Sequence, residues 1–155
     1  MKAYLVRHGE AVQKEVDPDR PLSEKGSNDV RTVARFAADR AGVKVHVIYH
    51  SGKTRAKETA EILTKHLNPI NGVVEDRGLE PDAEVSLWAM RLSEGEEDVM
   101  LVGHLPHLGR LASRLLCHDE NMEVVVFQTA GIVCLEKDEA GIWTLDWAVR
   151  PEMLP

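Results

Sequence analysis

Residues 3–10 read AYLVRHGE, an apolar run that stops abruptly at an arginine, a histidine and a glycine. The run from Tyr4 to Val6 suits a strand buried on both faces of a sheet. A buried parallel strand delivers the residues after it to the carboxyl edge of the sheet, where open α/β proteins bind ligands. We therefore expect Arg7 and His8 at the mouth of a crevice. Gly9 would let the backbone turn sharply or approach a ligand closely.

The rest of the chain alternates strand-like and helix-like segments. Apolar residues at helical spacing follow Ser23, a candidate N-cap, and stop at Gly42, a common helix end. A second helix is predicted from about Lys53 to His66, with Ser51 as its cap. Further helices are expected at 84–92 and 108–116, and further strands at 45–49, 73–75, 99–102, 124–128, 132–136 and 143–149. The alternation predicts one α/β domain over residues 1–155, with a largely parallel sheet and the last three strands as antiparallel edge strands.

The composition is that of an ordinary globular protein. Of the 155 residues 43% are hydrophobic, and no apolar run is long enough to span a membrane. The chain shows no signal-peptide pattern, so we expect a cytoplasmic protein. The net charge of −7 argues against nucleic acid as a partner, but not against an anionic substrate, because a few arginines can dominate the field in a cleft. We expect Cys117 and Cys134 to be buried, reduced thiols.

Polar side chains follow three of the predicted parallel strands. The first strand ends at Arg7 and His8, the second at Ser51 with Arg55 one turn into the next helix, and the fourth at His104. Parallel strands place their carboxyl ends on one edge, so these groups can converge. Arginine forks match phosphate oxygens, and the helix start adds free N–H groups. A neutral imidazole is a competent nucleophile toward phosphorus, which makes the set suited to phosphoryl transfer through a phosphohistidine.

Each of these residues also has a simpler explanation. A strand-end histidine is more often a surface residue than a catalyst, and an arginine on a helix is usually solvated. Gly9, Ser51 and His107 are further candidates for substrate binding, although the absence of a functional role is the commoner outcome for His107. A metal site is disfavoured because the histidines lack the spacing of metal motifs and the arginines would repel a cation, and no cofactor is implied. The segment SGKT at 51–54 lacks the glycine spacing of a P-loop.

Three segments resemble the signature blocks of the histidine phosphatase superfamily, which includes phosphoglycerate mutases and many phosphatases: LVRHGE at 5–10, SGKTRAKETA at 51–60 and VGHLP at 102–106. RPLSEKG at 20–26, FQTA at 127–130 and WAVRP at 147–151 resemble its SixA-type branch, the phosphohistidine phosphatases. The resemblance spans nearly the whole chain. It implies a three-layer α/β/α sandwich with a mixed, mostly parallel six-stranded sheet. It also implies that His8 is the nucleophile, with Arg7, Arg55 and His104 around the phosphate.

One segment departs from the pattern of larger family members. Those proteins supply a general-acid carboxylate from the loop after the third strand, in a leucine–any–glutamate pattern. Here the loop reads Leu79-Glu80-Pro81, and Pro81 takes the place of the acid. Glu80 or Asp82 could substitute by position, although neither matches the motif. The missing acid and the short chain resemble the SixA-type branch and imply an open site.

The resemblance implies a metal-independent hydrolase that dephosphorylates phosphohistidine on a signal-transduction or phosphotransfer protein through a phospho-His8 intermediate. The expected partner is therefore a phosphohistidine-bearing protein, such as a histidine phosphotransfer domain. Two alternatives stay open on the sequence alone. The first is a small-molecule phosphomonoesterase of the same superfamily. The second is a phosphate-binding adaptor without turnover, which the retention of all four core residues disfavours.

Overall fold

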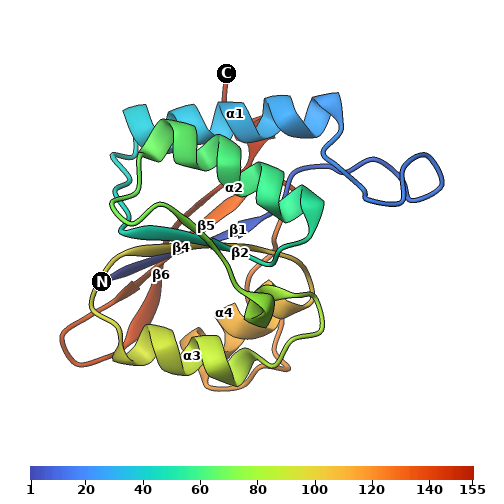
Figure 1. The fold of residues 1–155 in the computed structure, drawn as a ribbon. Coiled ribbons are helices and arrows are strands. Elements are labelled where there is room, and N and C mark those ends of the chain that lie inside the picture. Colours follow the sequence, from blue (N-terminus) through green and yellow to red (C-terminus); the bar gives the residue numbers. More distant parts are fainter.

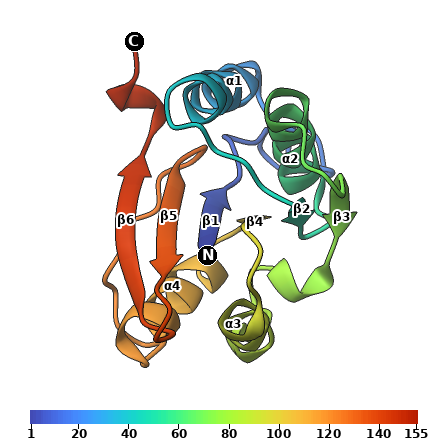
Figure 2. The ribbon, with the colours of Figure 1, turned by 90° about the vertical axis from the view of Figure 1, so that its left-hand side faces the viewer.

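A computed structural model describes all 155 residues, which form one six-stranded sheet between two layers of helices (Figures 1 and 2). The sheet order is β3-β2-β4-β1-β5-β6. The strands are β1 (Lys2–Arg7), β2 (Val47–His50), β3 (Val73–Glu75), β4 (Val99–Gly103), β5 (Ile132–Lys137) and β6 (Trp143–Val149). The first four pair in parallel, while β5 and β6 are antiparallel to their neighbours. The expected mixed, mostly parallel six-stranded α/β fold is confirmed.

Four helices cover the two faces of the sheet. α1 (Glu24–Asp39) and α2 (Thr54–Leu67) lie on one face, and α3 (Val85–Glu94) and α4 (His107–Cys117) lie on the other (Figure 2). β1 supplies both apolar layers, because successive side chains of a strand point to opposite faces. Tyr4 and Val6 pack in the layer beneath α1 and α2, whereas Ala3 and Leu5 pack in the layer beneath α3 and α4. The prediction of a strand buried on both faces is therefore correct.

The position of β1 in the sheet brings distant strand ends together. β1 lies between β4 and β5, and its register sets Arg7 opposite Gly103. Beyond the strand, the His8 N–H still donates to the Gly103 carbonyl at 3.1 Å. β2 pairs with the other edge of β4, with His50 opposite Val102. The carboxyl ends of β1, β4 and β2 are thus neighbours, as the parallel arrangement requires.

The predicted strand at 124–128 does not form. None of the N–H groups from 123 to 128 donates to another backbone carbonyl, and the Val126 side chain is 81% exposed. The segment has strand-like composition, but strand propensity needs a neighbouring edge to pair with. Both edges of β1 are occupied, by β4 and β5. β5 pairs with both β1 and β6, so it is an interior strand rather than the predicted edge strand. Only β6 and β3 lie at the edges of the sheet.

The helix ends agree with the sequence in one case and differ in two. Ser23 caps α1 as predicted, because its side chain accepts a hydrogen bond from the Gly26 N–H. α1 ends at Asp39 rather than at Gly42, which lies in the following turn with φ +61°. The N-cap of α2 is Lys53, not Ser51, and no side chain caps that helix. The Ser51 hydroxyl is used elsewhere, in a contact with His104.

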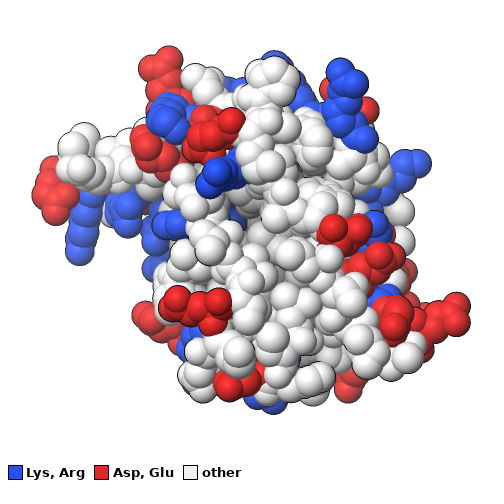
Figure 3. All heavy atoms as spheres, turned by 180° about the vertical axis from the view of Figure 1, so that it is seen from behind, with Lys and Arg blue, Asp and Glu red and all other residues white.

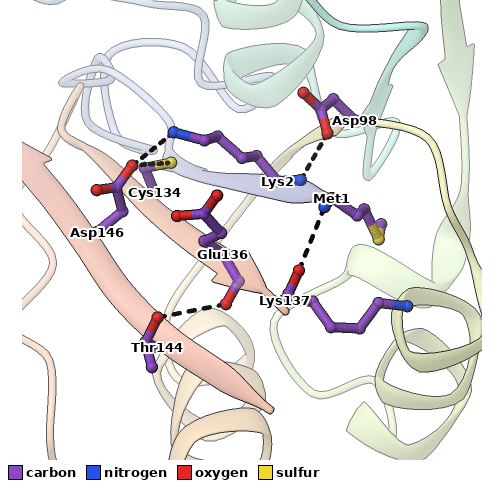
Figure 4. A network of polar contacts seen from close by, with 8 residues as sticks. All are labelled: Met1, Lys2, Asp98, Cys134, Glu136, Lys137, Thr144 and Asp146. Carbon is purple, nitrogen blue, oxygen red and sulfur yellow. Dashed lines mark hydrogen bonds and ion pairs between the residues drawn. The ribbon is translucent and has the colours of Figure 1, made fainter. Parts of the chain in front are cut away.

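The two cysteines are both free thiols, but only one is buried. Cys134 on β5 is fully buried, and desolvation raises its pKa to about 12. Its sulfur lies 3.9 Å from the Asp146 carboxylate, which also pairs with the Lys2 ammonium at 2.7 Å (Figure 4). Cys117 is exposed, contrary to the prediction. The apolar stripe of α4 faces the core, and Cys117 falls on the opposite side of the helix.

The segment between β1 and α1 forms an arm that projects from the body of the molecule (Figure 1). Its base is closed by a bridge between Ala11 and Leu22 and by the Val12 N–H, which donates to the Pro21 carbonyl at 2.8 Å. Seen from behind, the arm stands clear of the body and carries both basic and acidic side chains (Figure 3). The arm starts where β1 ends, so it borders the strand ends described above. None of the helices is long and apolar enough to cross a membrane.

Candidate active site

His8 leaves the end of β1 with its imidazole held in one tautomer. Its Nδ1 lies 2.7 Å from the Gly9 carbonyl oxygen, which can only accept, so Nδ1 carries the proton. The other ring nitrogen, Nε2, accepts from the Arg55 Nε–H at 3.3 Å. The contact with Arg55 requires a lone pair on Nε2. Burial, and to a smaller extent the charges of Arg55, Arg7 and Arg20, lower the pKa of His8 to about 4 against the opposing effect of the Gly9 carbonyl. His8 is therefore neutral near pH 7.

Two guanidinium groups lie beside His8 without a carboxylate partner. One Nη of Arg7 donates to the Phe127 carbonyl at 3.0 Å, and the buried Arg7 Nε has no partner. Arg55, in the first turn of α2, is bound only to His8 among the side chains. Neither arginine forms a salt bridge, and burial lowers the pKa of both. Both arginines are half-buried, and charges withdrawn from water are normally paired, so this arrangement favours an anion between the two forks.

His104 completes the group from the end of β4. It is only 2% exposed, and its ring centroid lies 4.9 Å from that of His8. Its Nε2 lies 2.6 Å from the Ser51 hydroxyl oxygen. Burial, and to a smaller extent the electrostatic effects of His8, Arg55, Lys53 and His107, lower the pKa of His104 to about 3. The fold thus brings together the four residues that the sequence analysis placed at the centre of the site.

The three further candidates for substrate binding, Ser51, Gly9 and His107, differ in whether they can reach a substrate. Ser51 lies in the site and bonds to His104. Gly9 packs so tightly that an added Cβ would lie 2.8 Å from Val30 Cγ2 and 2.9 Å from the Gly26 carbonyl oxygen. Its N–H is already bound to the Thr59 hydroxyl at 3.1 Å. His107 is fully buried at the start of α4, and neither of its ring nitrogens has a partner, so its ring presents no surface to a substrate.

The two candidate acids follow a short 3₁₀ turn, Arg77–Leu79, whose Leu79 carbonyl lies against Gly103 at the end of β4. Glu80 is half-buried and Asp82 is exposed. Neither carboxylate forms a hydrogen bond or an ion pair, and neither is bound to His8. The charge of Asp82 acts on Arg110, whose pKa is raised mainly by Glu120. No group of three or more His, Cys, Asp or Glu side chains is arranged to hold a metal ion.

Two residues of the site were not singled out from the sequence. Arg20, on the arm, has a positive φ of 48° and donates from Nε to the Val12 carbonyl at 3.2 Å. Its charge lowers the pKa of both His8 and Arg55, so it faces the site. Thr59 on α2 is fully buried and bonds to Gly9. Both residues lie within the segments that resemble the family, but only their spatial neighbours indicate what they do.

The class of protein follows from this fold and from the family model of the histidine phosphatase superfamily (branch 1), which matches residues 3–82. The chain belongs to that superfamily. The phosphohistidine phosphatase SixA of Escherichia coli (strain K12) is 29% identical over 156 residues, covering 97% of this chain and 94% of that protein. The mitochondrial serine/threonine-protein phosphatase PGAM5 of Mus musculus is 34% identical over an alignment of 102 residues. That alignment covers 61% of this chain and 35% of that protein.

Solved structures show the same fold over the whole chain. The structure of the protein histidine phosphatase SixA complexed with tungstate has a TM-score of 0.87 and 26% identity, and the match covers 99% of both chains. The putative phosphohistidine phosphatase SixA from Agrobacterium tumefaciens has a TM-score of 0.77 and 24% identity, with 97% of both chains covered. The second likeness concerns the fold alone.

Proposed function

We propose that this chain is a metal-independent phosphohistidine phosphatase that acts on a phosphohistidine-bearing protein. One observation carries the proposal: a neutral histidine whose Nε2 bears a lone pair lies beside two half-buried arginines that have no carboxylate partner. A phosphoryl group supplies the missing negative charge and presents its phosphorus to the imidazole. The SixA protein of Escherichia coli, similar over nearly the whole chain, supports the choice of phosphohistidine as substrate.

The first step of the proposed reaction transfers the phosphoryl group to His8. The Arg55 Nε–H turns from His8 Nε2 to a phosphoryl oxygen, and the Nε2 lone pair then attacks phosphorus in line with the P–N bond of the substrate. As the new bond forms, the old bond breaks, and its electron pair stays on the substrate imidazole, which takes up a proton. Arg7 and Arg55 hold the phosphoryl oxygens, where charge is greatest in the transition state. The Gly9 carbonyl stabilises the positive charge that His8 gains, because it accepts the Nδ1–H.

In the second step a water molecule hydrolyses phospho-His8. The water oxygen bonds to phosphorus, the P–Nε2 bond breaks, and the water gives up a proton, so that inorganic phosphate and neutral His8 result. His104, 4.9 Å from His8 between ring centroids, acts as a further donor to the transferred group. Its pKa of about 3 applies to the site without an anion, and a bound phosphate favours the protonated imidazole.

The proposed reaction does not need the general acid that the family motif would supply. An ester releases an alkoxide, which needs a proton from a positioned acid, and such an acid contributes about 10²–10⁴-fold. A phosphohistidine releases an imidazole, which is a much better leaving group once protonated near neutral pH. Pro81 in the place of the motif carboxylate therefore fits the cleavage of a P–N bond better than that of an alkyl phosphate.

The test is to trap the intermediate and compare substrates. The native protein is mixed rapidly with a protein carrying chemically phosphorylated histidine, quenched in base and mapped by mass spectrometry. We expect an acid-labile phosphoryl group on His8 and none in His8→Ala, which should lose turnover but stay folded. The exposed His66 provides a matched control, and His66→Ala should behave as the native protein. Full activity in His8→Ala, or a higher kcat/KM for a sugar phosphate than for the phosphohistidine protein, would refute the proposal.

A further inference from the structure

Thr59 joins the two segments that carry the nucleophile and an arginine of the site. It lies on α2, is fully buried, and belongs to neither the proposed nucleophile nor the arginine pair. Its hydroxyl oxygen accepts from the Gly9 N–H at 3.1 Å, and its proton is donated to the Arg55 carbonyl at 2.7 Å. One side chain thus connects the loop after β1 with the first turn of α2.

These two bonds close a circuit around His8. The carbonyl of Gly9 holds the His8 Nδ1–H at 2.7 Å, while its N–H is held by Thr59. From Thr59 the path returns through the Arg55 carbonyl and the Arg55 Nε–H to His8 Nε2 at 3.3 Å. Each link lies within hydrogen-bond distance. The position of the Gly9 backbone therefore affects both ring nitrogens of His8. The Gly9 carbonyl contacts Nδ1 directly, and the Gly9 N–H is linked to Nε2 through Thr59 and Arg55 on α2.

The opposite side of Gly9 is already closed by packing. An added Cβ would lie within 3 Å of Val30 Cγ2 and of the Gly26 carbonyl oxygen, both on α1. α1 therefore limits movement of Gly9 on that side, and the Ala130 N–H, which donates to the His8 carbonyl at 3.1 Å, also restrains the peptide group between His8 and Gly9. The hydroxyl of Thr59 supplies the restraint from α2, and it is the one hydrogen bond that the Gly9 N–H makes.

We propose that Thr59 is a positioning residue that restrains the backbone of Gly9 at its N–H, and through the Gly9 carbonyl the tautomer of His8 and the separation of His8 from Arg55. The inference rests on the proposed role of His8 as nucleophile. Without the hydroxyl, the Gly9 N–H loses its partner, and the backbone of Gly9 can shift so that its carbonyl, in the next peptide group, moves away from the His8 Nδ1–H. A histidine that loses its carbonyl acceptor populates the Nε2–H tautomer, which has no lone pair on Nε2 to attack phosphorus.

A threonine inside a helix often bonds to the carbonyl four residues earlier, and that bond alone has only a local effect. α2 contains a second such threonine. The Thr64 hydroxyl donates to the Ala60 carbonyl at 2.8 Å and makes no contact with the site. Thr64→Val removes the local helix bond, whereas Thr59→Val removes the same kind of bond and the link to Gly9. The pair separates the two effects within one helix.

The experiment compares Thr59→Val, Thr59→Ser and Thr64→Val. Turnover of a phosphohistidine protein gives kcat and KM, and ¹⁵N–¹H NMR of the imidazole groups gives the tautomer of His8 without substrate. We expect Thr59→Val to lower kcat by 10- to 100-fold, on the scale of a nucleophile displaced by about 1 Å, with KM little changed. The His8 signals should shift toward the Nε2–H form. Thr59→Ser, which keeps the hydroxyl, should restore both readouts, and Thr64→Val should match the native protein.

Native kcat and a native His8 tautomer in Thr59→Val would overturn the inference, as would an equal loss in Thr64→Val. If Thr59→Val does not fold, Thr59→Ala replaces it with the same expected shifts. The proposed function fails separately, when the native protein forms no phospho-His8. The tautomer readout needs no substrate, so it tests the effect of Thr59 on His8 in either case.

Discussion

His107 gives a prediction whose size can be worked out from its surroundings. The side chain is fully buried at the start of α4, and neither ring nitrogen has a partner. Burial and, to a smaller extent, the charge of Arg110 together lower its pKa from the usual 6.5 to about 4. The folded protein therefore keeps His107 neutral at a pH where the unfolded chain already binds a proton on this residue.

The sign and size follow from proton linkage. Between pH 6.5 and 4 the unfolded state binds more protons than the folded state, so the free energy of unfolding falls as the pH falls. With pKa values of about 4 folded and 6.5 unfolded, His107 alone removes roughly 2.4 kcal/mol between pH 7 and pH 4.5. His8 and His104 have lowered pKa values too and act in the same direction. A variant without His107 isolates its share.

We predict that His107→Leu loses about 2 kcal/mol less stability than the native protein over this pH range. Urea unfolding followed by far-UV circular dichroism at pH 7.0 and pH 4.5 measures the four free energies required. His66→Leu, at an exposed position, should keep the native pH dependence. An identical fall in the native protein and in His107→Leu would show that His107 is protonated in the folded state, contrary to its burial.

Further predictions concern the chemistry of the site. Arg7→Lys and Arg55→Lys keep the charge but lose the fork, and steady-state kinetics should show kcat/KM reduced by about 100-fold or more for each. Glu80→Gln and Asp82→Asn should change phosphohistidine turnover only modestly, because an imidazole leaving group does not need a carboxylate to protonate it; a loss on every substrate in either variant would reveal a general acid. Among leaving groups, we expect kcat/KM to be highest for the phosphohistidine protein, lower for aryl phosphates and lowest for sugar phosphates. EDTA should leave the activity unchanged, and restoration of a chelated enzyme by a divalent ion would contradict the arginine clamp.

The sequence by itself determined the layers of the fold and the edge of the sheet at which the site lies. The run from Tyr4 to Val6 is local and apolar, so it predicts a buried strand whatever surrounds it. The sequence could also place Arg7, His8, Arg55 and His104 near one another, because the carboxyl ends of parallel strands must share an edge. That rule needs only the order and type of the elements, which periodicity and helix caps such as Ser23 supply.

The tertiary structure alone decided which of the candidate groups are bound and which are free. The strand-like segment 124–128 joins neither edge of the sheet, and its Phe127 carbonyl instead receives Arg7. Ser51 bonds to His104 rather than capping α2, and Thr59 reaches Gly9 from 50 residues away. Such contacts depend on ångström-scale distances between segments far apart in the chain. Local pattern sets the segments, but only their packing sets those distances and, with them, the protonation of His8.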